Sequence, residues 1–78
     1  MNDDLFAACL YTQAASLDVT NALTIINRLQ SASDTTLERR YQLTLDATRK
    51  LEDALKSLDG ALRLVETVQQ EGFHTLRN

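Results

Sequence analysis

The 78-residue sequence contains no proline, no tryptophan, only two glycines and a single cysteine. Proline and glycine are the residues that most often interrupt helices, so their scarcity favours a chain that is helical almost throughout. Cys9 has no second cysteine with which to form an intrachain disulfide, and one cysteine with one histidine does not make a structural zinc site. We therefore expect a reducing, cytoplasmic setting and a fold that depends on packing alone.

The chain also lacks an excess of positive charge and a long apolar run. Its formal net charge is −3, whereas binding to phosphate backbones generally requires clustered lysine and arginine. The longest stretch without a charge, residues 5–17, is shorter than the about 20 residues that cross a bilayer. We expect no nucleic-acid partner and no membrane span.

What the sequence does contain is a seven-residue repeat that begins at Leu37. Alternating steps of four and three residues connect Leu37, Tyr41, Thr44, Thr48, Leu51, Leu55, Leu58, Leu62, Val65, Gln69, Gly72 and Leu76. Such a repeat keeps one face of a helix turned toward a neighbouring helix along its whole length. A column of small residues, Ala47, Ala54, Ala61 and Val68, lies beside this row, and we expect it to widen the same buried stripe.

Polar residues at positions 31–34 predict one turn between two helices. Thr35 and Glu38 match a capping box that opens the second helix. A connection this short makes the two helices antiparallel neighbours. We predict an all-α fold, an antiparallel helical hairpin in a single domain over residues 1–78. Its expected parts are a helix over about 3–30, a turn at 31–34, a helix over about 35–71 and a frayed tail at 72–78.

The two glycines are the points where the second helix could break or end. Asp59–Gly60 is a turn signal, and a break there would give a three-helix bundle. Because Leu58 and Leu62 keep their register across the glycine, we expect a continuous helix, straight or bent near Gly60, with this glycine on its outward face. Gly72 is expected to be the left-handed residue just past the end of the helix.

The first helix is nearly uncharged and apolar on more than one side. Residues 1–30 carry four charged side chains, whereas the remaining 48 residues carry fifteen. One apolar face comprises Leu5, Cys9, Val19, Leu23 and Ile26, and another comprises Tyr11, Ala15, Ala22, Ile25 and Leu29. One neighbouring helix cannot cover both faces. Either a third segment of the chain folds back over the second face, or the hairpin completes a helical bundle by association.

We favour association, either with a second copy in a homodimeric four-helix bundle or with a different helical partner protein. The residues expected at the partner interface are Tyr11, Leu23, Ile26, Leu51, Leu55, Leu58, Leu62 and Val65. The predicted function is a small non-catalytic interaction module, acting as an adaptor, an assembly subunit or a co-chaperone. No catalytic residue, metal ligand or cofactor is predicted.

Two alternatives rest on particular residues. Glu71 and His74 have the Glu-x-x-His spacing of di-metal helical bundles, which would make the protein a metal-dependent enzyme or store. Arg39, Arg40 and Arg49 are the core of the densest basic group, which would grip RNA in a hairpin dimer. Because acidic residues are interleaved with these arginines, we expect solvent-facing charge there rather than a nucleic-acid site.

In outline the sequence resembles the small helical hairpins of bacterial type III secretion, both the needle subunits and their co-chaperones. The features that carry the resemblance are the neutral first helix, the short polar turn, Asp34, Leu37, Tyr41–Gln42 and the long second helix. The turn at 31–34 lacks the proline typical of needle subunits. The resemblance implies a cytoplasmic protein that shields a helix of its partner before assembly and that has no catalytic residues.

Overall fold

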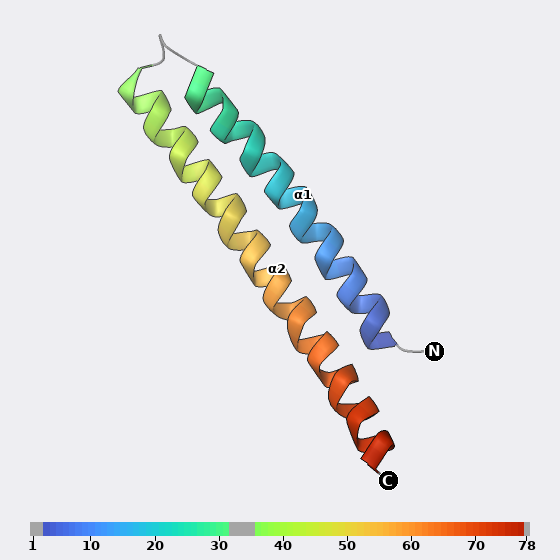
Figure 1. Cartoon of the computed structure of the whole chain (residues 1–78). Helices are drawn as coiled ribbons and strands as arrows, with labels where there is room; N and C mark the ends of the chain where they lie inside the picture. Colours follow the sequence, from blue (N-terminus) through green and yellow to red (C-terminus); the bar gives the residue numbers. More distant parts are fainter. Residues whose placement is uncertain (1–2, 32–35, 78) are drawn as a thin grey trace.

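The chain folds into two long antiparallel helices in a computed structural model that describes residues 3–31 and 36–77 (Figure 1). Helix α1 spans Asp3–Ser31 and helix α2 spans Leu37–Arg77. In α2 the side chains are described up to residue 73. The described residues contain no strand, so the expected all-α antiparallel hairpin is confirmed. Helix α2 continues through Gly60, and the three-helix alternative is therefore wrong.

Both ends of α2 differ in detail from the expectation. At its start, the Thr36 side-chain oxygen accepts a hydrogen bond from the Arg39 backbone N–H at 3.2 Å, which makes Thr36 the N-cap. Thr35, the expected cap, lies outside the described residues. At the other end α2 continues to Arg77, and no described glycine has a positive φ, so the ending predicted at Gly72 is wrong. A glycine inside a helix is only about 1 kcal/mol less favourable than alanine, and this difference is too small to end α2 at Gly72.

The two helices contact each other through small residues spaced by seven. The buried residues are Ala8, Ala15 and Ala22 on α1, and Leu43, Ala47, Ala54 and Ala61 on α2. A heptad spacing returns each alanine to the same face, and a side chain of one methyl group allows the two backbones to come close together. The column of alanines on α2 is thus the intrachain contact, whereas the leucine row beside it lies outside that contact.

Two contacts fix how the helices are aligned. Near the turn, Arg40 Nη1 donates a hydrogen bond to the backbone carbonyl of Leu29 at 3.1 Å. Farther along, Gly60 lies against the ring of Tyr11, where a Cβ on the glycine would be 3.6 Å from the ring. Gly60 is therefore half-buried, and the expectation that it faces outward is wrong. In both contacts the two residue numbers add up to about 70, which defines the register of the hairpin.

Helix α2 is longer than its partner and extends past it. It has 41 residues against 29 in α1, and its C-terminal end projects beyond the first turn of α1 (Figure 1). With the register above, residues after about 67 have no residue of α1 opposite them. The molecule is a thin rod of 65 × 16 × 14 Å. No described helix is long and apolar enough to cross a membrane.

Candidate protein-binding face

A second set of apolar rows follows the buried alanines on both helices. One and four residues after Ala54 come Leu55 and Leu58, and one and four residues after Ala22 come Leu23 and Ile26. On each helix the apolar row follows the buried alanines by the same number of residues, and the two helices run in opposite directions. The two apolar rows therefore lie on the same side of the hairpin. Together they form one continuous surface.

We name this surface the leucine face. Its members on α1 are Leu5, Cys9, Thr12, Ser16, Val19, Leu23 and Ile26. Its members on α2 are Leu37, Tyr41, Thr44, Thr48, Leu51, Leu55, Leu58, Leu62 and Val65. Ten of the sixteen exposed large apolar side chains of the described residues belong to it, and Leu55 is 66% exposed. Isolated exposed leucines are ordinary on protein surfaces, whereas a contiguous surface of this size is typical of an interaction site.

The threonine side chains of the leucine face already form hydrogen bonds within their own helices. The Thr12 hydroxyl donates to the Ala8 carbonyl at 2.8 Å. The Thr44 hydroxyl donates to the Tyr41 carbonyl at 2.6 Å, and the Thr48 hydroxyl to the Thr44 carbonyl at 2.8 Å. These threonines can therefore be covered by a partner without leaving a hydroxyl group unpaired, a loss that burial would otherwise make costly.

The structure places seven of the eight residues predicted for a partner interface on the leucine face. These are Leu23, Ile26, Leu51, Leu55, Leu58, Leu62 and Val65, of which all but the half-buried Ile26 are exposed. Tyr11 is the exception, because its ring packs over Gly60 of the same chain. Val19 and Tyr41 also belong to this face but were not predicted at the interface, although their spacing from the other members could have identified them. Whether a partner covers this surface stays a prediction.

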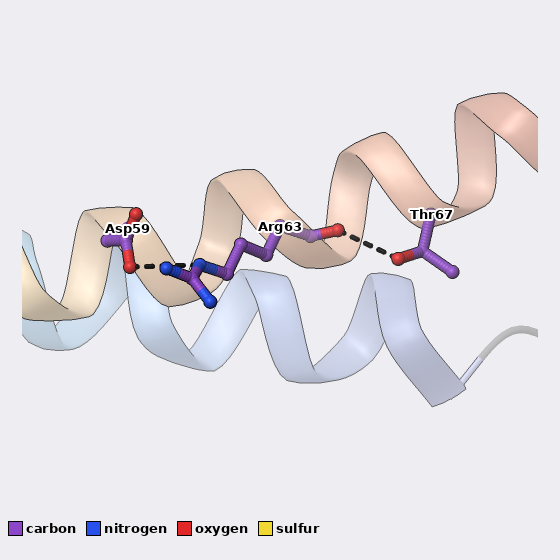
Figure 2. Close-up of polar contacts among 3 residues, drawn as sticks. All are labelled: Asp59, Arg63 and Thr67. Atoms are coloured by element: carbon purple, nitrogen blue, oxygen red, sulfur yellow. Dashed lines mark hydrogen bonds and ion pairs between the residues drawn. The ribbon is translucent and has the colours of Figure 1, made fainter.

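An acidic row follows the leucine face along the outer edge of α2. It consists of Glu38, Glu52, Asp59 and Glu66. Asp59 Oδ2 pairs with Arg63 Nε at 3.1 Å, and the Thr67 hydroxyl donates to the Arg63 carbonyl at 2.9 Å (Figure 2). The corresponding pair between Glu52 and Lys56 is not formed in the described part of the chain. Both side chains of the Asp59–Arg63 pair are mostly exposed, so the pair supports the helix by a few tenths of a kcal/mol at most.

The basic group lies partly in the hairpin contact. Arg40 is half-buried, and its guanidinium group binds the carbonyl of Leu29 near the C-terminal end of α1. Lys50 is half-buried as well, in the row that faces α1. The expectation that the arginines of this group face solvent is therefore wrong for Arg40, whereas Arg39 and Arg49 are exposed as expected. A cation near the C-terminal end of a helix is favourable, so Arg40 has a structural role.

The residues of the di-metal alternative lie on the projecting end of α2. Glu71 is exposed there, and the side chain of His74 is outside the described residues. Among the described side chains, no three histidine, cysteine or acidic residues are close enough to hold a metal ion.

Apolar side chains also occur on the other side of α1. Leu10 and Leu17 are exposed there, and Ala7, Leu10 and Tyr11 line an open hollow of about 290 Å³. Helix α2 adds mostly polar residues, such as Arg49, Asp53 and Lys56, to this side, and Leu64 there is half-buried. The exposed apolar side chains of this surface therefore come from one helix, whereas those of the leucine face come from both. Cys9 is exposed on the leucine face.

A comparison of the chain with protein families, curated proteins and solved structures finds no match.

Proposed function

We propose that this chain is a small non-catalytic protein–protein interaction module whose leucine face binds a helical partner. The observation that supports the proposal most strongly is the contrast between the two apolar surfaces of the hairpin. The surface between its own helices is built from alanines, whereas most of its leucines face outward. A chain that folded alone would be expected to bury its largest apolar side chains first.

The energetics agree with this proposal. A buried alanine contributes one methyl group, worth roughly 0.8 kcal/mol, whereas a fully buried leucine contributes about 1.5–3 kcal/mol. Six of the seven buried apolar residues of the described chain are alanines. Ordering the backbone of each residue costs about 1–2 kcal/mol. The hairpin therefore gains much of its stability from whatever covers the leucine face.

The leucine face is suited to a partner that is itself helical. Its two apolar rows run parallel to the helix axes over several heptads, which is the pattern of helix–helix packing. In this role the chain is an adaptor, an assembly subunit or a co-chaperone in the cytoplasm. The architectural resemblance to type III secretion hairpins supports the co-chaperone version, in which the leucine face shields an apolar helix of its partner.

Site-specific photocrosslinking in the cells that produce the protein tests the proposal. A photoreactive benzophenone amino acid is placed at Leu55 on the leucine face or at Leu17 on the other side of the hairpin. These two side chains are 66% and 63% exposed, so the positions are matched. We expect a covalent adduct with a protein from position 55 and little or none from position 17. No adduct from position 55, or equal adducts from both positions, would show that the leucine face is not a binding surface.

A further inference from the structure

The leucine face has the size and pattern to pair with itself. Building on the proposed function, we propose that its occupant is a second copy of this chain. The two hairpins stack face to face, with α2 of one copy over α1 of the other, to form an antiparallel four-helix bundle. The two-fold axis runs along the bundle, so both turns lie at the same end.

The exposed apolar area is sufficient for a stable dimer. Ten large side chains of the leucine face are between 41% and 86% exposed. At roughly 100 Å² each they present on the order of 1,000 Å² per copy, compared with about 800 Å² per partner in a standard stable interface. The surface is also linear and spans both helices, as one half of a four-helix bundle requires.

Large and small residues alternate between the two helices of the leucine face. In the register of the hairpin, Leu55 and Leu58 of α2 lie beside Thr12 of α1. Thr44 and Thr48 of α2 lie beside Leu23 and Ile26 of α1. Stacking α2 over α1 of the second copy thus sets large apolar side chains against small ones in these two layers, the arrangement that fills a core without voids.

Charge favours the same arrangement. The acidic row runs along the outer edge of α2, whereas the equivalent row of α1 consists of Phe6, Gln13, Thr20 and Asn27. With α2 over α1 of the second copy, each acidic row lies beside a neutral row. With α2 over α2, two acidic rows would lie side by side and repel each other.

The first experiment measures molecular mass and thermal stability of the purified full chain over a range of concentrations. A dimer has twice the chain mass of 8.7 kDa, and its Tm rises with protein concentration. Leu55→Glu places an unpaired charge in the interface and should weaken dimerisation at least about 100-fold. Leu17→Glu, at a matched exposure outside the leucine face, should leave the dimer intact. Should Leu55→Glu fail to fold, the concentration dependence of the unaltered chain still decides the question.

The second experiment tests which helices face each other, using Cys9 as a reporter. In the proposed bundle Cys9 lies opposite Leu62 of the second copy and far from the other Cys9. Mild oxidation of Leu62→Cys should therefore give a covalent dimer, whereas Arg63→Cys, one position further on the outward side, should not. Efficient coupling of Cys9 to Cys9 in the unaltered chain would overturn the arrangement, because a disulfide requires Cα atoms within about 7 Å.

The outcomes separate this inference from the proposed function. A chain that stays monomeric, with a Tm independent of concentration, overturns the self-association. A photocrosslinked adduct at position 55 with a mass other than that of two copies would then show a different helical partner, and the proposed function would stand. Absence of any adduct, together with a stable monomer, would overturn both.

Discussion

The aromatic ring of Tyr11 on α1 lies flat against Gly60 on α2. A methyl group on Gly60 would be 3.6 Å from the ring atoms Cδ1, Cδ2 and Cε1, the distance of an ordinary van der Waals contact. Gly60 is thus half-buried under an aromatic side chain, in the middle of an unbroken helix. This contact makes the glycine part of the hairpin interface.

Gly60→Ala should stabilise the protein. Alanine is about 1 kcal/mol more favourable than glycine inside a helix, and its methyl group would contact the Tyr11 ring without a clash. The expected result is a gain of about 1 kcal/mol in the free energy of unfolding, measured by circular dichroism. Gly72→Ala is the control, because that glycine has no neighbour within 4 Å and lies near the helix end, so its gain should be smaller. A loss of stability in Gly60→Ala would show that the ring cannot accept the methyl group.

Ala15→Leu should destabilise the hairpin. Ala15 is 1% exposed, and a leucine there would force apart two helices that are held close by small residues. Over-packing of this kind costs about 1–3 kcal/mol. Ala14→Leu adds the same atoms at the neighbouring exposed position and should change the free energy of unfolding by less than about 0.5 kcal/mol. Equal effects in the two variants would contradict the alanine contact.

Arg40→Met should loosen the turn end of the hairpin. The substitution keeps an apolar stem but removes the guanidinium hydrogen bond to the Leu29 carbonyl, and hydrogen bonds to charged groups contribute about 1.5 kcal/mol or more. The expected result is a loss of that size in denaturant unfolding. Arg39→Met, at an exposed neighbouring position, should be nearly neutral. If Arg39→Met lowered the free energy of unfolding by as much, the positive charge at this end would be important rather than the hydrogen bond to Leu29.

Leu58→Ala should reveal whether the leucine face is covered in solution. In the single chain this side chain is 43% exposed, so its truncation alone should cost little. Under conditions where the protein is associated, the expected cost is about 2 kcal/mol per copy or more. Leu10→Ala, 51% exposed outside the leucine face, should stay within about 0.5 kcal/mol. Similar small losses in both variants would mean that Leu58 is not buried by any partner.

Much of the hairpin follows from the sequence. The absence of proline, the polar turn and the unbroken leucine register predicted two antiparallel helices, with the second continuing through Gly60. The two apolar faces of α1 were also identified, and the one that includes Ala15 and Ala22 is the face that packs on α2. The helix ends were predicted less well, since an N-cap and a terminal glycine involve only about 1 kcal/mol each.

The sequence did not decide which stripe of α2 faces α1. Leucines are more hydrophobic than alanines, so the leucine row would be expected to occupy the contact and the alanines its edge. The structure shows the reverse, because small side chains allow the backbones to approach closely. The signal that could have indicated this is the seven-residue spacing of Ala8, Ala15 and Ala22, which matches that of the alanines on α2.

The projecting end of α2 gives the rod two unlike tips. At one tip the two helices end side by side, and at the other about ten residues of α2 have no residue of α1 opposite them (Figure 1). Amide protons in this solitary stretch should exchange with solvent sooner than those beside the alanines, since no second helix protects them. In the proposed bundle of two copies, two such unpaired helix ends would project from one end of the assembly only, so the two ends of the assembly would differ.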